Sequence, residues 1–360
     1  MTLQIKSRDH TSRNVRFNIG IVDVLETQGG RRAFIDSFFK ALGREGHTVK
    51  IIRLDTVSVG ELNSFDILHF STHYLSLNLW KLLFARHPKK ILTVHGWIRS
   101  EVLWAMRNQS NLRTKIACLL SLLTMKLMPL FFDLTTCPSR RTADENNLRN
   151  AVIISNAIFP EYFENISEIK TPRNQNEVWF VTYASAGGSS DILKITILNI
   201  KEVVEKLNEL LKNRKVKLMI FGKDYLGTDR SSCIFFMGYS SKFLNFLKSS
   251  DLFIVAGPFF PGYAEMEAGI LGLPVAKFTD DYAVEEIVDG QTGILAKDKA
   301  ELVNKLLNYI LNLKREKQRL GSNFRRYIEN NRSWDSVIPL WNRLFMDVLA
   351  GKHEQILKYE

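Results

Sequence analysis

The sequence has few cysteines and no apolar leader, and both features limit what the protein can be. Its 360 residues include three cysteines that lie far apart, which excludes a disulfide scaffold and a CxxC-type metal site. Residues 1–16 are polar and of mixed charge, without the apolar core of a secretory signal. We therefore expect a protein of a reducing compartment, the cytoplasm.

Common nucleotide-binding and catalytic motifs are also missing. The sequence contains no GxGxxG, GxxxxGK[ST], HExxH or GxSxG motif. It also lacks an Asp-x-Asp pair that could hold a hard cation. We therefore expect neither a metal nor another cofactor.

Basic residues are in excess, and they are unevenly distributed. The net charge is +11, and residues 1–170 carry 23 Lys and Arg against 15 Asp and Glu. Such a first half favours contact with phosphates, on nucleic acid or on an anionic membrane. However, the sequence has no arginine-rich tract, RNP motif or zinc-finger spacing, so we expect no nucleic-acid partner and keep nucleic-acid binding as an alternative.

One apolar stretch, Ile116 to Phe132, is interrupted by Lys126 and Pro129. A membrane-spanning helix needs about 20 apolar residues without a central charge, so we predict a largely buried helix instead. The alternative is an interfacial helix, flanked by Arg113, Lys115 and Lys126, on anionic headgroups. That alternative and the basic first half also predict peripheral association with the cytoplasmic face of a membrane.

Short strand-like runs alternate with helical stretches, the pattern of a parallel sheet with helices on its faces. In the first half, an apolar helical face formed by Phe34, Phe38 and Leu42 follows the first strand, and Gly43 and Gly46 end that helix. The predicted strands here are Phe17–Val24, Thr48–Leu54, Ile67–Phe70, Ile91–Val94, Leu134–Thr136 and Val152–Ile154.

The alternation restarts after a polar segment with two prolines, so we predict a second doubly wound domain. Its predicted strands are Val178–Tyr183, Lys217–Phe221, Ile234–Met237, Leu252–Val255 and Val275–Lys277, and its predicted helices are Asp191–Leu211, Ala300–Arg326 and Trp334–Leu349. The expected division is a first domain at 1–160, a linker at 161–177, a second domain at 178–333 and a helical tail at 334–360. Ligands of such sheets bind outside the carboxyl ends of the strands, here in the cleft between the domains.

Three glycine-containing loops stand where a strand gives way to a helix, at residues 28–30, 185–191 and 257–264. Backbone N–H groups and a helix N-terminus can hold an anion at such a place without any charged side chain. Together the three loops predict a phosphate-bearing ligand.

The segment Leu252–Ile294 is the most specific part of the sequence. A strand and a glycine-containing loop lead to a Glu-Ala helix, a Gly-x-Pro-Val turn and a Glu-Ile-Val-x-Asp-Gly-x-Thr-Gly run. This order resembles the C-terminal signature of retaining GT-B glycosyltransferases of family 4, the glycosyl transferases group 1. Further matches along the chain are Gly29-Gly30, Gly46–Val49, Thr93–Gly96, Ser155–Ile158 and Ser333–Asp335.

The resemblance implies a divergent member with the GT-B fold: two Rossmann-like α/β domains face a cleft, and C-terminal helices cross back to the first domain. The implied activity is transfer of a sugar from a nucleotide diphosphate sugar to a hydroxyl, with retention of configuration. The implied acceptor is lipid-linked, a glycan or a small molecule.

The resemblance also implies roles for single residues. Glu267 would accept hydrogen bonds from the ribose of the donor, and His95 would lie near the transferred sugar and the leaving phosphate; these two are the predicted catalytic residues. A purely structural role is the alternative for each. The donor phosphates are assigned to Gly29, Gly30, Gly187, Gly188, Lys194 and Lys223, and the donor sugar and nucleotide to Phe259, Gly262, Tyr263, Ala264 and Glu267.

The remaining polar candidates receive structural interpretations. Glu265 and Glu286 are interpreted as solvated or capping residues. His47, His69 and His73 are interpreted as structural, with an acceptor contact as the alternative for His73.

Departures from the family pattern keep other functions open. The first of two family glutamates is replaced by Phe259, and the basic residues that normally neutralise the donor diphosphate are missing from Tyr183–Gly188. Either Lys194 or Lys223 replaces them, or the N-terminus of the helix that begins near Asp191 stabilises more of the diphosphate charge. A catalytically impaired sugar-nucleotide-binding protein is therefore an alternative, as is a sugar-nucleotide epimerase of the same fold, which would need further carboxylates.

Overall fold

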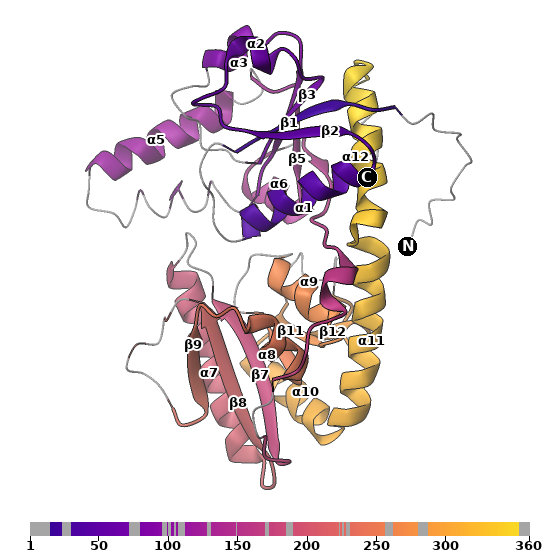
Figure 1. Ribbon diagram of the computed structural model, residues 1–360. Helices are drawn as coiled ribbons and strands as arrows, with labels where there is room; N and C mark the ends of the chain where they lie inside the picture. The colour runs from indigo at the N-terminus through magenta and orange to yellow at the C-terminus, as the bar shows by residue number, and fades with distance from the viewer. Residues whose placement is uncertain are drawn as a thin grey trace.

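The computed structural model contains two parallel sheets, one in each half of the chain, stacked along the long axis of the molecule (Figure 1). The described residues are 15–23, 30–71, 80–95, 99, 102–103, 106, 112–127, 131–148, 150–169, 173–184, 190–222, 224, 227, 231–255, 262–279 and 287–352.

The first sheet has six parallel strands in the order β2-β1-β3-β4-β5-β6. Its strands are β1 (Asn18–Val22), β2 (Thr48–Ile52), β3 (Ile67–Phe70), β4 (Lys89–Thr93), β5 (Leu134–Cys137) and β6 (Val152–Ile153). The helices of this half are α1 (Gly30–Arg44), α2 (Val59–Leu62), α3 (Trp80–Phe84), α5 (Leu112–Leu127) and α6 (Arg140–Glu145). Helices cover both faces of this sheet, which is why β3 is buried along its whole length.

The second sheet also has six parallel strands, in the order β12-β11-β10-β7-β8-β9. Its strands are β7 (Glu177–Ala184), β8 (Lys215–Gly222), β9 (Ile234–Gly238), β10 (Leu252–Ile254), β11 (Val275–Phe278) and β12 (Gly293–Ala296). The other elements are the 3₁₀ turn η3 (Pro160–Phe163) and the helices α7 (Ser190–Leu210), α8 (Phe243–Ser249), α9 (Tyr263–Ile270), α10 (Lys299–Leu311), α11 (Leu313–Asn331) and α12 (Trp334–Leu349). These two sheets confirm the predicted α/β fold class.

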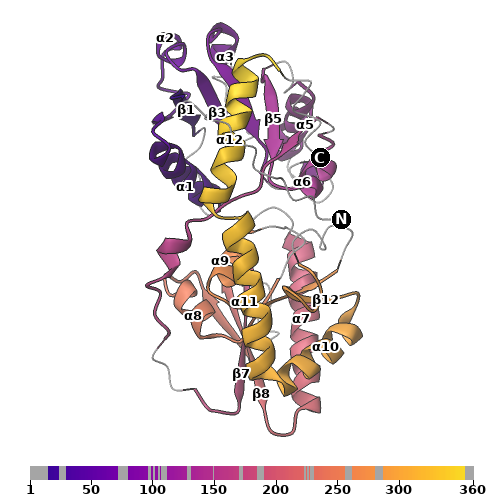
Figure 2. The same cartoon turned by 90° about the vertical axis from the view of Figure 1, so that its right-hand side faces the viewer.

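The final helix, α12, leaves the second half and packs on the first sheet, as the resemblance implied (Figure 2). Trp334 and Trp341 of α12 are buried in one core cluster with Phe34 and Phe38 of α1. The Trp341 ring lies 4.8 Å from that of Phe38, between ring centroids. The first domain is therefore completed by the C-terminus of the chain.

The two crossings between the halves run beside each other. The Ile158 N–H donates to the Arg332 carbonyl at 2.9 Å, and the Trp334 N–H donates to the Ile158 carbonyl at 3.0 Å. Between these two bonds, the Ser333 hydroxyl accepts from the Ser336 N–H at the start of α12. The hydrogen bonds between these two adjacent chain segments thus fix where α12 begins.

Three expectations differ from the structure. The strand β12 was not predicted, because Gly293–Ala296 is too short to show a period. The stretch Ala300–Arg326 forms two helices that meet at Asn312, which is both the C-cap of α10 and the N-cap of α11. The predicted largely buried helix within Ile116–Phe132 is wrong, because α5 ends at Leu127 and Ile116, Leu119, Leu120, Leu123 and Leu127 are exposed, while Leu122 is half-buried. Within the described residues, no helix combines the length and apolar character that a membrane span requires.

We expect Trp341→Ala to lower the free energy of unfolding by about 3–5 kcal/mol, because the ring is fully buried and its removal leaves a cavity. Urea unfolding measures the effect. The neighbouring Leu340 is exposed on the same helix, so Leu340→Ala should change stability by less than about 0.5 kcal/mol. Equal effects of the two substitutions would contradict the docking of α12.

Candidate functional site

In each sheet, the strand order reverses at one point. The first sheet reverses between β1 and β3, and the second between β7 and β10. Ligands of open parallel sheets bind outside the carboxyl ends of the strands at this switch point. In the second sheet these ends are Ala184 and Ile254, and α9 begins nine residues after Ile254. The site is therefore built from the start of α9 and the end of β7.

Several predicted site residues lie outside the described residues: Gly29, Gly187, Gly188, Lys223 and Phe259, together with His73 and Glu286. Gly30 is the first residue of α1. Lys194 lies in the first turns of α7, and its side chain is exposed. The assignment of these residues to the donor stays a prediction.

The start of α9 is held by its own carboxylate. Glu265 is buried, and its side chain accepts a hydrogen bond from the Gly262 N–H, which precedes the helix. This contact satisfies a backbone donor that the helix leaves unpaired. The capping interpretation of Glu265 is thereby confirmed.

A close helix contact holds α9 from the other side. A Cβ at Gly269 would lie 2.8 Å from side-chain atoms of Phe324 and Ile328 on α11. Only glycine permits this approach without a shift of α11. The orientation of α9, and of every side chain on it, is thus set by α11.

Glu267 is presented differently from Glu265. Its side chain is partly buried, and within the described residues its carboxyl group has no hydrogen-bond or ion-pair partner. Burial raises the pKa of Glu267 to about 8. The Glu267 charge also contributes to raising the pKa of Tyr183, at the end of β7, and of Tyr263, one helical turn earlier on α9. The carboxyl group is therefore placed at the switch point without a partner among the described residues.

Tyr263 connects this edge to the first domain. Its ring packs against the core cluster that contains Phe34 and α12, and its hydroxyl approaches Ser37 of α1. Burial of that hydroxyl is the main cause that raises the pKa of Tyr263. Tyr263 therefore contributes to the packing between the halves, and its contact with a donor stays a prediction. Gly262 and Ala264 on either side are partly buried.

His95 also lies against α1. It follows the end of β4, and its ring centroid is 4.5 Å from that of Phe34. Phe34 and Ser37 are one turn apart on α1, so the same helix contacts His95 and Tyr263. Helix α1 thus lies next to His95 of the first domain and to Tyr263 of the second, and the catalytic assignment of His95 and Glu267 stays a prediction.

His69 is a structural histidine, as expected. Its Nε2 lies 2.7 Å from the Thr93 hydroxyl, which in turn lies 2.7 Å from the Thr136 hydroxyl. Complete burial lowers the pKa of His69 to about 3, with a smaller contribution from His95. The imidazole is therefore neutral and serves the core beneath His95.

His47 has a structural role as well. Its Nδ1 accepts from the Phe17 N–H at 3.2 Å, so Nε2 carries the proton and donates to Asn342 on α12 at 2.9 Å. This bond adds a polar tie between the first sheet and α12.

A comparison with known proteins agrees with this geometry. The family model of glycosyl transferases group 1 matches residues 193–312, and no curated protein sequence matches the chain. Among solved structures, a sucrose-phosphate synthase from Thermosynechococcus elongatus aligns with a TM-score of 0.66 at 14% identity, over 93% of this chain and 100% of that chain. HepE from Anabaena, in complex with UDP and glucose, aligns with a TM-score of 0.63 at 14% identity, over 92% and 100%. The chain is a divergent glycosyltransferase with the GT-B fold.

Two residues of this glycosyltransferase near the switch point were not predicted. Tyr183 is the last but one residue of β7, and its ring contacts that of Phe243 on the same face as α9. Thr182 is fully buried on the other face, and its hydroxyl has no partner within the described residues. Sequence analysis could have found both residues from their position at the carboxyl end of a predicted strand.

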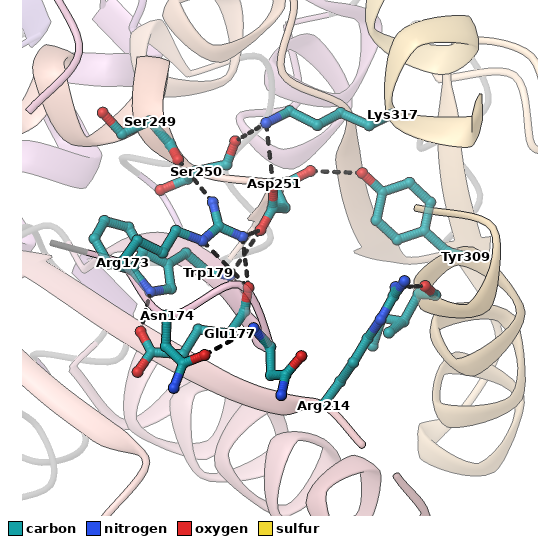
Figure 3. A network of polar contacts seen from close by, with 12 residues as sticks. Arg173, Asn174, Glu177, Trp179, Arg214, Ser249, Ser250, Asp251, Tyr309 and Lys317 are labelled. Carbon is teal, nitrogen blue, oxygen red and sulfur yellow. Dashed lines mark hydrogen bonds and ion pairs between the residues drawn. The ribbon is translucent and has the colours of Figure 1, made fainter. Parts of the chain in front are cut away.

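A strong ionic cluster lies at the other end of the second sheet (Figure 3). The Asp251 carboxylate accepts from Arg173, from Lys317 at 3.2 Å and from the Trp179 N–H at 2.9 Å, while its carbonyl accepts from the Tyr309 hydroxyl at 2.6 Å. The cluster joins the starts of β7 and β10 to α10 and α11, so it holds the domain together at the edge opposite the site. The described residues contain no group of His, Cys, Asp or Glu side chains that could bind a metal ion.

We expect Glu267→Gln to stabilise the glycosyltransferase increasingly as the pH rises from about 5 to 8. The folded carboxyl group titrates near 8 and the unfolded one near 4.5, so between these values only the folded state holds the proton. Stability falls with rising pH wherever the folded state binds more protons, and glutamine carries no such proton. Urea unfolding at several pH values measures the difference.

The control is Glu209→Gln, at an exposed carboxylate near the end of α7, which should show no such trend. A stability difference between Glu267→Gln and wild type that does not change with pH would mean that the Glu267 carboxyl is not perturbed.

Proposed function

We propose that this glycosyltransferase moves a glycosyl unit from a nucleoside diphosphate sugar to a hydroxyl group, with retention of anomeric configuration. The observation that carries the proposal is the partly buried carboxyl group of Glu267, which stands at the switch point of the second sheet and has no hydrogen-bond or ion-pair partner in the part of the chain that the structure describes. A buried carboxyl group without a partner is costly for folding, which is consistent with a role in ligand binding. HepE binds UDP and UDP-glucose, which supports a nucleotide sugar as the donor.

In the proposed complex, Glu267 accepts hydrogen bonds from the ribose hydroxyls of the donor. Gly29, Gly30, Gly187 and Gly188 surround the diphosphate with backbone N–H groups, and Lys194 or Lys223 supplies a cation. The diphosphate is the leaving group, so the transition state gains charge on its oxygens, which the N-terminus of the long helix α7 also stabilises. His95, on the first-domain side, would contact the transferred sugar.

The remaining predicted residues would shape the donor pocket. Phe259, Gly262 and Ala264 would contact the donor, together with Tyr263. The acceptor hydroxyl, on a glycan, a lipid-linked molecule or a small molecule, would approach from the first domain. Closure of the two domains would then exclude water and limit hydrolysis of the donor.

Nucleotide sugars with different bases, including UDP-glucose, should raise the melting temperature selectively, and the best stabiliser should release its nucleoside diphosphate when an acceptor is present. In Glu267→Gln, the affinity for that donor should fall by about one to two orders of magnitude, because charge-assisted hydrogen bonds of about 1.5–3 kcal/mol are weakened. Isothermal titration calorimetry measures the affinity.

The wild-type affinity should also rise from pH 6.5 to about 9 and then level off. The free carboxyl group, with a pKa of about 8, must lose its proton to accept the ribose hydroxyls. Glu267→Gln should lack this dependence, and Glu209→Gln should behave as wild type. Glu265→Gln is no control, because Glu265 caps α9.

Unchanged affinity in Glu267→Gln would show that Glu267 is structural. Donor binding without release of nucleoside diphosphate would instead favour the catalytically impaired alternative.

We further expect transfer to continue in excess EDTA. In the proposed complex, backbone N–H groups, a helix N-terminus and a lysine contact the donor diphosphate, so no metal ion is needed there. Activity is measured as nucleoside diphosphate release before and after chelation. Loss of activity that magnesium or manganese restores would replace this description of the phosphate site with a metal-dependent one.

A further inference from the structure

The helix α5 exposes one continuous apolar face. Six large aliphatic residues on it are 38–70% exposed: Leu112, Ile116, Leu119, Leu120, Leu123 and Leu127. At about 100° per residue, these positions fall within an arc of about 100° on the helix. They therefore form a single stripe along the whole length of α5, and we call these six residues the α5 face.

This exposure is unusual for the place of α5 in the fold. The helix connects the parallel strands β4 and β5, and such crossover helices normally bury their apolar side on the sheet. In the described residues, the four core clusters contain no α5 side chain. Figure 1 shows α5 standing out to one side of the first domain. An apolar stripe of this length in water indicates a binding surface.

The charge of α5 indicates what covers this face. The helix contains Arg113, Lys115 and Lys126 and no acidic residue. Contact with a second copy through the same face would bring two basic helices together and be opposed by like-charge repulsion. An anionic lipid surface meets both requirements, since it accepts apolar side chains and attracts the flanking cations.

We propose that the α5 face docks the glycosyltransferase on anionic membranes. The leucines enter the boundary between headgroups and acyl chains, while the basic residues contact the headgroups. The helix belongs to the first domain, from which the acceptor approaches in the proposed function, so docking brings that domain to the membrane. On the basis of the proposed function, the acceptor hydroxyl then belongs to a lipid-linked molecule.

Flotation in a density gradient tests the docking without any assay of transfer. The probes are vesicles of phosphatidylcholine alone and vesicles that contain 30% phosphatidylglycerol, about one anionic lipid in three, in low and high salt. Wild-type protein should float with the anionic vesicles in low salt, and at least tenfold less with neutral vesicles. High salt should reduce flotation, because it screens the attraction of the basic residues.

The test variant is Leu119→Glu/Leu123→Glu, which places two charges in the middle of the α5 face. Both side chains are exposed, so the fold should tolerate the change, which an unchanged melting temperature would verify. We expect flotation to fall at least tenfold. The matched control is Leu210→Glu/Leu311→Glu, at two exposed leucines of the second half, and it should float as wild type does.

The docking proposal is overturned if wild-type protein stays at the bottom with anionic vesicles in low salt, or if the α5 variant floats normally. It is also overturned if wild type sediments as a dimer and the α5 variant as a monomer, because a second copy would then cover the face. Donor affinity, measured on the same variants, should be unchanged. A protein that floats but binds no nucleotide sugar would refute the proposed function and leave the docking intact.

Discussion

The packing of α12 on the first sheet is the interaction on which the rest of the structure depends. The helix brings Trp334 and Trp341 from the end of the chain into the core that α1 and the first sheet share. The chain crosses between the halves twice at one place, beside Ile158. Tyr263 adds a second contact between the halves, because its ring packs against the core clusters of both. The relative position of the two sheets therefore depends on the paired crossing, on α12 and on the start of α9.

The start of α9 shows how one helix can place two nearby carboxyl groups in different environments. Glu265 turns back to the Gly262 N–H, so its charge is used within the protein. Glu267, two residues later, points about 200° away around the helix axis, toward the edge where Tyr183 and Tyr263 lie. Its pKa rises because burial removes water from the carboxyl group, which has no partner within the described residues. The geometry of one short helix therefore gives two carboxyl groups, two residues apart, different surroundings.

Much of the fold could be predicted from sequence because parallel strands buried on both faces are apolar throughout. The run Ile67–Phe70 was predicted with its observed bounds, and α12 likewise, since Ser333 caps a strongly amphipathic stretch. Glu267 could be selected from its motif. The electrostatic interaction between Tyr183 and Glu267 could not be predicted, because it depends on how β7 and α9 pack in three dimensions. Single-sequence patterns carry no information on such contacts between segments about 80 residues apart.

For α5, the sequence correctly predicted a helix, but it wrongly predicted that the helix is largely buried. Leucine at helical spacing predicts burial only if something is available to bury it. One face of the first sheet is covered by the cluster that includes α1 and α12. The other is covered by a cluster that runs from Val22 to Phe132 and includes Leu82 of α3. With both faces occupied, the sheet has no need of α5 for its core. The exposed residues of the α5 face therefore contribute little to folding, and the proposed membrane docking would explain their arrangement as one stripe.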